Sequence, residues 1–259
     1  MERRLKERRN SLLRERGRRR GVWLGCLALL VLAAAGWFWL RSSKELAVDH
    51  IVAPVTERVR AADIEEALEP ALGGNLVRLS TRTLEGNLRS IPYVREAHVY
   101  KRFPNGLEVR LEEYVPFARI LGRPDEIWAV ADDGRVLELL EPEEDPGGPV
   151  IVPGQEIWPE AGEMLPDTFS GAVVLTGILK ESRFWGAEHP VARLLVDTEA
   201  RITMVLGGGA EVRMGDPTDL EAKLAVAEEV VRTWLASGRQ LQYVDVQVWD
   251  RPVAMPRSS

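Results

Sequence analysis

The architecture of the first folded part of the chain follows from Val94-Arg-Glu-Ala-His-Val-Tyr-Lys-Arg-Phe-Pro-Asn-Gly-Leu-Glu-Val-Arg-Leu-Glu-Glu-Tyr114. Apolar and polar residues alternate on both sides of Pro104-Asn105-Gly106, which is typical of half-buried strands. The strands are predicted at Val94 to Lys101 and at Leu107 to Tyr114. Because Asn-Gly tolerates the positive φ of a tight turn, the stretch predicts a β-hairpin.

The sequence before this hairpin predicts one strand and two helices. Leu46 to Val52 alternates in the manner of a half-buried strand. One helix is predicted from about Ala61 to Pro70, and a second from Ser80, a good N-cap, to Pro92. The order is strand, helix, helix, strand, strand. Because neighbouring elements with short connections pack together, the two helices should cover one face of a three-stranded sheet.

The sequence beyond the hairpin reads mainly as short strands, which predicts a second, β-rich domain. Its first hairpin joins Ile127 to Val130 with Val136 to Leu140 across Asp132-Asp133-Gly134. Glu141 to Pro149 is an acidic loop, and Ser170 to Lys180 is predicted as a short helix. Further strands are predicted at Val150 to Val152, Leu194 to Val196, Arg201 to Leu206 and Ala210 to Met214.

A helix and a strand are the last predicted elements. Asp216 is a good N-cap, Pro217 fits the first helical position and Gly238 closes an amphipathic helix. Tyr243 to Trp249 then alternates as a final strand. The alternation directs one set of its side chains to the core: Val244, Val246 and Val248.

The segment Gly21 to Leu40 is free of charged side chains and follows a strongly basic N-terminus. As a helix it would be about 30 Å long, the thickness of a bilayer's hydrocarbon core, so it predicts one membrane span. Residues 1–20 carry ten Lys or Arg and three acids, which predicts that this end is cytoplasmic. A cleaved signal peptide would end in small residues, whereas this run ends in Trp37-Phe38-Trp39-Leu40. A buried soluble helix is the alternative.

Several of these stretches resemble one known family. A Pro-aromatic-Val turn stands in Ile91-Pro-Tyr-Val-Arg-Glu-Ala-His-Val99, and a Pro-Asn hairpin with an acidic residue before Pro-x-Ala stands in Arg102-Phe-Pro-Asn-Gly-Leu-Glu-Val-Arg-Leu-Glu-Glu-Tyr-Val-Pro-Phe-Ala118. The chain thereby resembles the FtsQ/DivIB bacterial cell-division proteins. Tyr114, where the family usually has Arg, and Ala53-Pro54, where a Gly is usual, depart from that pattern.

The resemblance implies an α+β chain with one N-terminal transmembrane helix, a polypeptide-transport-associated (POTRA) domain of order β-α-α-β-β, and a mainly antiparallel β domain that ends in an amphipathic helix and a strand. It further implies a bitopic protein of the bacterial cytoplasmic membrane, with the folded domains outside and concentrated at the division septum. The expected divisions are a basic cytoplasmic tail at 1–20, the span at 21–40, the POTRA domain at 45–115, the β domain at 116–253 and a short tail at 254–259.

No catalytic constellation is evident in the sequence. The three histidines, His50, His98 and His189, are scattered, and no metal-binding spacing occurs. Gly207-Gly208-Gly209 precedes a predicted strand rather than a helix, so it is a turn and not a phosphate loop. The single cysteine, Cys26, excludes an intramolecular disulfide. We therefore expect no enzyme activity, cofactor, metal, small-molecule substrate or nucleic acid.

The resemblance implies a scaffold of the cell-division machinery that binds an FtsB-type subunit, itself in complex with an FtsL-type subunit. Septal peptidoglycan synthesis proteins are a further partner class. A POTRA-containing envelope assembly or secretion component is the alternative function, and an anchored enzyme or sensor is a third class.

The final strand is the predicted partner-binding segment. A C-terminal strand is easily an edge, where free backbone groups can pair with an extended partner. The alternative is an internal strand whose Trp249 caps the core. Val248 and Asp250 stand where the family commonly has an aromatic and a small residue. The predicted partner-binding residues are Tyr243, Val244, Asp245, Val246, Gln247, Val248, Trp249 and Asp250.

Overall fold

The computed structural model describes residues 23, 26–39, 43–123, 126–141, 147–238 and 240–256. The predicted cytoplasmic tail at 1–20, the centre of the acidic loop and residues 257–259 lie outside this part. The chain forms two compact units. Unit 1 comprises Met1–Val55, Ala61–Asn87 and Ala97–Arg110, and unit 2 comprises Thr56–Arg60, Leu88–Glu96 and Leu111–Ser259.

Residues 26–39 are helical, and their apolar side chains are exposed. Within the described ranges, no helix combines the length and the apolar character needed to cross a membrane. The predicted span extends from 21 to 40, and both of its ends lie outside the described residues.

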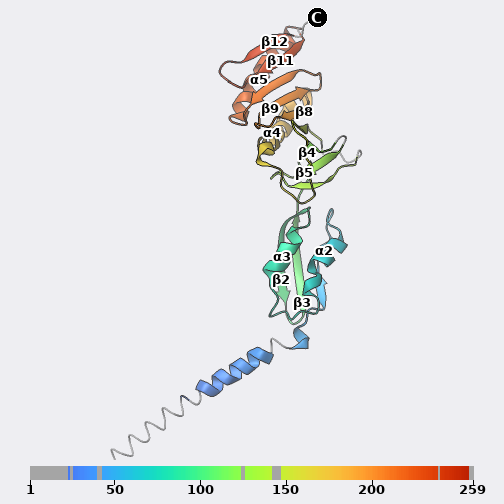
Figure 1. Cartoon of the computed structure of the whole chain (residues 1–259), viewed down its shortest axis with the longest axis vertical. Helices are drawn as coiled ribbons and strands as arrows, with labels where there is room; N and C mark the ends of the chain where they lie inside the picture. Colours follow the sequence, from blue (N-terminus) through green and yellow to red (C-terminus); the bar gives the residue numbers. More distant parts are fainter. Residues whose placement is uncertain are drawn as a thin grey trace, which may run out of the picture. The chain divides into compact units, whose positions relative to one another are not determined.

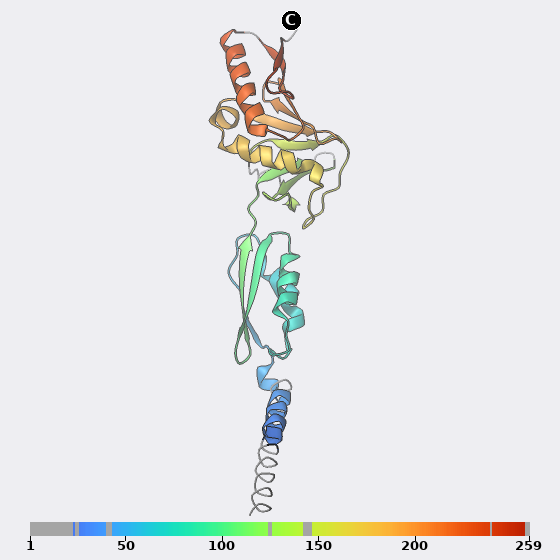
Figure 2. The same cartoon turned by 90° about the vertical axis from the view of Figure 1, so that its left-hand side faces the viewer.

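Unit 1 is built around a three-stranded sheet of order β1-β3-β2, with α2 and α3 on one face (Figure 1). Its sheet and helices are β1 (His50–Val52), α2 (Ala61–Leu68), α3 (Thr81–Arg89), β2 (Val94–Arg102) and β3 (Gly106–Glu113), with 3-10 turns at Lys44–Leu46 and Glu69–Ala71. The predicted order of elements and the helical cover of the sheet are confirmed. Figure 2 shows the helices and the sheet as two layers.

The predicted first strand is wrong in length, and of the side chains expected on its buried face, Leu46, Val48, His50 and Val52, only Val48 is fully buried. Only His50–Val52 is a strand, and the side chains of His50 and Val52 are exposed. The backbone before it pairs with a loop instead: the N–H of Leu76 donates to the carbonyl of Leu46 at 2.7 Å, and that of Gly73 donates to Val48 at 2.9 Å. The alternation of apolar residues in one segment cannot predict this pairing, because the pairing depends on residues about 25 positions later in the sequence.

The hairpin turn forms where it was predicted, but for a different reason. The backbone φ angles of Asn105 and Gly106 are not positive. A Cβ atom at Gly106 would lie 2.6 Å from Nε2 of the exposed His50 side chain and 3.2 Å from the carbonyl oxygen of Arg102, so a larger residue would displace the imidazole and crowd the turn. Ser80 is confirmed as an N-cap, because its Oγ accepts from the backbone N–H of Thr83 at 3.4 Å.

Unit 2 contains a mixed nine-stranded sheet of order β12-β11-β10-β9-β8-β7-β4-β5-β6. The β4/β7, β7/β8 and β10/β11 pairs are parallel, and the other recorded pairs are antiparallel. Its strands are β4 (Ala118–Leu121), β5 (Ile127–Val130), β6 (Val136–Leu139), β7 (Val150–Pro153), β8 (Val191–Val196), β9 (Ile202–Leu206), β10 (Glu211–Gly215), β11 (Leu241–Asp245) and β12 (Val253–Pro256).

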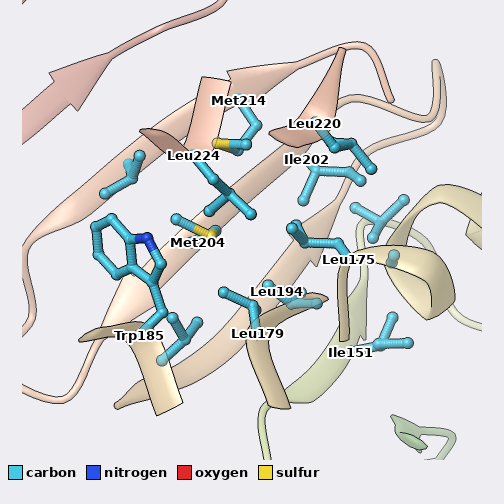
Figure 3. Packing of buried hydrophobic residues seen from close by; sticks show 14 of the residues in the cluster. Ile151, Leu175, Leu179, Trp185, Leu194, Ile202, Met204, Met214, Leu220 and Leu224 are labelled. Carbon is cyan, nitrogen blue, oxygen red and sulfur yellow. The ribbon is translucent and has the colours of Figure 1, made fainter. Parts of the chain in front are cut away.

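Two helices, α4 (Ser170–Glu181) and α5 (Leu220–Ala236), bury apolar residues in one cluster with the inward-facing side chains of this sheet. Figure 3 shows Leu175, Leu179 and Trp185 packed beside Met204 and other strand residues. The helix predicted at Ser170 to Lys180 is confirmed. The core of unit 2 is therefore a continuous helix-on-sheet layer that needs no disulfide.

The last helix begins later than predicted. Asp216 does not cap it, because three residues separate Asp216 from Leu220. Its carboxylate accepts from Nζ of Lys223 at 2.6 Å and from the hydroxyl and the backbone N–H of Thr218 at 2.6 and 3.4 Å. Residue Asp219, with φ 48°, precedes the first helical residue, Leu220. The Asp216 carboxylate therefore binds a buried lysine and the segment before the helix, and not the first turn of the helix.

Candidate partner-binding surface

The sheet of unit 2 ends at β12, which hydrogen-bonds to β11 on one side and is last in the strand order. The prediction of one final strand over Tyr243 to Trp249 is wrong. Strand β11 ends at Asp245, whose Oδ1 accepts from the N–H of Gln247 at 3.0 Å and so begins a turn. The chain then returns antiparallel, with Ala254 opposite Val244. Strand β11 is consequently internal, and the edge belongs to β12.

The sequence does not predict β12, because this strand has only four residues and little alternation of apolar and polar side chains. It lies in the segment that was expected to hold the domain end at 253 and a tail. Pro252 and Pro256 flank or end it, and proline argues against a strand in a sheet interior. Proline is tolerated on an edge, where a missing N–H need not break a ladder. The signal that could have found the strand is this edge-compatible proline spacing around a short apolar run.

Four exposed apolar side chains gather on β12 and on the turn before it, and we name them the C-terminal patch: Val248, Trp249, Val253 and Met255. Trp249 is 48% exposed, so it does not cap the core. Val248 is exposed as well, against the prediction that it faces the core, because the strand has ended before it. Val244 and Val246 are buried as predicted.

The face of β10 and β11 that points away from the core adds charge to this region. The guanidinium of Arg213 lies 3.9 Å from the centroid of the Tyr243 ring, a close cation–π contact. Arg213 also pairs with Glu211 at 3.3 Å and stands in register with Asp245. Tyr243 and Asp245 are thus half-buried members of a mixed-charge face, next to the edge but not on it.

A groove of about 360 Å³ borders the same turn. Its lining includes Arg201, Arg213, Gly215 and Gln247. Gly215 has φ 70°, and a Cβ there would lie 2.7 Å from Cγ of Gln247, so glycine lets the turn pack closely on the end of β10. The predicted residues 243–250 therefore share one region, but only its turn residues are exposed beside β12.

The opposite edge of the sheet is covered. The N–H of Val136, in β6, donates to the carbonyl of Glu163 at 2.8 Å, and the N–H of Gly162 donates to the carbonyl of Val136 at 2.8 Å. Arg58 forms an ion pair with Glu138 in the same strand at 3.1 Å. Of the two edges in the described sheet, β12 is thus the one left for an added strand.

No cluster of three or more His, Cys, Asp or Glu side chains suited to a metal ion occurs among the described residues. His50 lies on the exposed β1 strand, where Nδ1 contacts Asp49 at 2.6 Å. His189 packs on the Phe184 ring, with centroids 4.6 Å apart. His98 lies on β2, so the three histidines occupy separate places in the fold.

Comparison with known families gives two matches, one after the other along the chain. Residues 47–114 match a family model described as "POTRA domain, FtsQ-type", and residues 118–247 match one described as "Cell division protein FtsQ/DivIB, C-terminal". Strand β12 lies beyond the second match.

Curated proteins named "Cell division protein FtsQ" are similar to this chain over most of their length. "Cell division protein FtsQ" of Anaeromyxobacter sp. (strain K) is 29% identical over 92% of this chain and 83% of the relative. The protein of that name from Allochromatium vinosum is 27% identical over 87% of this chain and 82% of the relative. A shorter match to the Burkholderia pseudomallei protein of that name is 36% identical over 36% of this chain.

Proposed function

The chain belongs to the FtsQ/DivIB family of cell-division proteins, and from this premise we propose that it is a non-catalytic, membrane-anchored scaffold that links FtsB/FtsL-type partners into the division machinery. The observation that carries the partner-binding part is the exposed edge of β12 beside the C-terminal patch.

The anchor of this proposal is residues 21–40, with residues 1–20 in the cytoplasm and residues 45–259 outside. Its support is the charge-free run and the net charge of +7 on the first twenty residues. External protease on spheroplasts should remove the acidic domains and spare the basic tail. Protection of the acidic domains would contradict this topology.

Partner binding is proposed to occur by strand addition. An extended segment of the FtsB-type subunit would pair with the free backbone groups of β12 and continue the sheet. Its side chains would contact Val253 and Met255, which project from the same strand with exposures of 57% and 47%. Trp249 would act as an aromatic anchor, the type of residue that often dominates interface energetics. The predicted site thereby shifts from β11 to the turn and β12.

The sharpest test places charged side chains on the edge strand β12 and leaves the core residues unchanged. In Val253→Lys/Met255→Lys, two lysines would stand on the edge strand, where they oppose further pairing. Val174, in α4, is 56% exposed and apolar, so Val174→Lys is a matched control away from the edge. Trp249→Ala and Trp158→Ala form a second pair, since Trp158 is also exposed.

The readout is recovery of the co-expressed FtsB/FtsL-type complex with the full chain from solubilised membranes, with folding checked by circular dichroism. The edge variants should weaken binding by about 2 kcal/mol or more, roughly thirtyfold, and the controls should not. Wild-type recovery with both folded edge variants would show that β12 is not the binding edge. Localisation is a separate test: a tagged chain should concentrate at mid-cell, and diffuse envelope fluorescence would oppose the division role.

A further inference from the structure

One end of unit 1 exposes two large apolar side chains. Phe103, in the turn between β2 and β3, is 65% exposed, and Leu72, in the loop after the second 3-10 turn, is 53% exposed. Single exposed apolar residues are ordinary on protein surfaces. The exposure of Phe103 and Leu72 alone therefore indicates no function, and what distinguishes the two residues is where they lie in the fold.

The topology puts both residues where the chain enters the domain. Strand β1 is parallel to β3, with His50 opposite Gly106, so both strands begin at the same end of the sheet. The turn that holds Phe103 directly precedes β3, and its Asn105 carbonyl accepts from the N–H of Asp49 at 3.1 Å. In Figure 2 this turn lies at the end of the sheet where the first 3-10 turn, Lys44–Leu46, enters.

The loop that holds Leu72 is fastened to the same entering segment. The Gly73 N–H donates to Val48, and the side-chain amide of Asn75 donates to the carbonyl of Ser43 at 3.2 Å. Two loops far apart in sequence thus flank residues 43–49. These hydrogen bonds hold Phe103 and Leu72 near the start of the folded domain.

Chain length then limits how far this end can lie from the predicted span. Only Arg41 and Ser42 lie between Leu40 and Ser43, so the three residue steps from Leu40 to Ser43 reach at most about 11 Å when fully extended. The headgroup region outside the hydrocarbon core is roughly 5 to 8 Å thick on each side. If the span is seated at 21–40, this end of unit 1 therefore lies at or just above the headgroups.

The charges at this end suit an anionic lipid surface. Lys44, Lys101 and Arg102 stand on the entering segment and beside Phe103. Arg102 is ion-paired with Glu108, Asp49 contacts His50 and Glu45 is exposed, so Lys44 and Lys101 are the cations that this end offers to anionic lipid. Segments that lie in the membrane interface usually combine Lys or Arg with Phe, Leu or Trp side chains that are exposed in the absence of lipid.

We propose that this end of unit 1, which we name the lipid-facing tip (Leu72, Lys101, Arg102 and Phe103), rests on the membrane and inserts its two apolar side chains among anionic lipid headgroups. The proposal rests on the single span in the proposed function. Such a contact would fix the tilt of unit 1 against the bilayer, beyond the tethering that the span alone provides.

The test uses the full chain in nanodiscs that contain anionic lipid. Cys26→Ser gives a cysteine-free background. An environment-sensitive fluorophore is then attached at Leu72→Cys, or at Val55→Cys as the control. Val55 is apolar and fully exposed, and it lies three residues past the end of β1, away from the tip. Lipids with a spin-labelled headgroup serve as the quencher.

The reporter at position 72 should be quenched more strongly than the one at 55, and adding Phe103→Ser should reduce that quenching. Replacing anionic with zwitterionic lipid should also reduce it. Equal quenching at 72 and 55 in nanodiscs that retain the protein would overturn the proposal and leave the scaffold function intact. Burial of the reporter only when partner subunits are added would assign the tip to a protein and likewise overturn it. Failure of the chain to stay in nanodiscs after carbonate washing would refute the anchor itself.

Discussion

Tyr93 shows how single residues set the stability of unit 2. Its hydroxyl donates to the carboxylate of Glu138, and Arg58 contacts both the hydroxyl oxygen and that carboxylate. Burial, and next the hydrogen bond to Glu138, raises the pKa of the Tyr93 phenol above its ordinary value of about 10. The neutral phenol is thus the form that the fold stabilises.

The sign of the pH dependence follows from that raised pKa. Because the folded pKa of Tyr93 exceeds the unfolded one, its contribution is fully present below about pH 10 and is lost as the pH rises further. The free energy of unfolding should therefore fall above pH 10 in the wild type. Denaturant melts of Tyr93→Phe should show a weaker fall over that range. An identical alkaline slope in both proteins would contradict the role of Tyr93.

A second residue-scale prediction concerns Lys223, whose side chain is 2% exposed and whose Nζ donates to the carboxylate and backbone carbonyl of Asp216. The hydrogen bond from Lys223 lowers the pKa of Asp216 to about 2. Removing the carboxylate leaves a buried ammonium with one partner fewer, whereas replacing the lysine by an apolar residue does not. Asp216→Ala should cost about 1 to 3 kcal/mol and exceed the cost of Lys223→Met. Thermal melts that reverse this order would show that the pair is not needed.

At the scale of elements, two helical glycines should respond to alanine in opposite ways. A Cβ at Gly171, in the first turn of α4, would lie 2.3 Å from Cβ of Pro217, so Gly171→Ala must displace the segment before α5. At Gly86, in α3, no atom other than those of the helix's own neighbouring backbone lies within 4 Å of that position. Gly86→Ala should stabilise the protein by about 0.5 to 1 kcal/mol through helix propensity, and Gly171→Ala should destabilise it by about 1 to 3 kcal/mol through overpacking. Chemical denaturation of the two variants makes the comparison.

At the scale of the whole molecule, the boundary between compact units does not coincide with the boundary between the two family matches. Unit 2 includes Thr56–Arg60 and Leu88–Glu96 although the POTRA match covers 47–114. Within unit 2, Arg95 pairs with Asp132 at 3.0 Å and Tyr114 donates to Asp133 at 2.6 Å. The guanidinium of Arg135 donates to the carbonyl of Pro92 at 3.1 Å. Segments before residue 115 are thus structural parts of the β-rich unit.

A truncation tests this arrangement. A fragment that starts at residue 116 would keep Asp132, Asp133 and Glu138 but lose the side chains that contact them. It should therefore unfold at lower denaturant concentration than the same β-rich unit in the full chain, even though the family boundary is respected. The reporter is Trp185 fluorescence, with the other tryptophans replaced. Equal midpoints would show that the leading segments do not support the unit.

The sequence alone determined those features that depend on local pattern. The hairpin around Asn105, the N-cap at Ser80 and the helix from Ser170 follow from alternation, capping and spacing, which neighbouring residues specify. The run 91–118 indicated the family and with it the order of the two domains. Val244 and Val246 are buried as the alternation predicted, because Val246, the first residue past β11, still donates its backbone N–H to the carbonyl of Arg213 in β10 at 3.0 Å.

Tertiary structure decided the features in which distant segments compete for the same groups. The carboxylate of Asp216 binds Lys223, and α5 starts after it, at Leu220. The loop at 73–76 forms hydrogen bonds with backbone that was expected to belong to the first strand. Most important for function, β11 ends at the turn that Asp245 begins. The chain then returns antiparallel as β12, so residues 253–256 form the edge of the sheet. A strand's place in a sheet is set by its partners across space, and a local pattern carries no information on which strand is left without one.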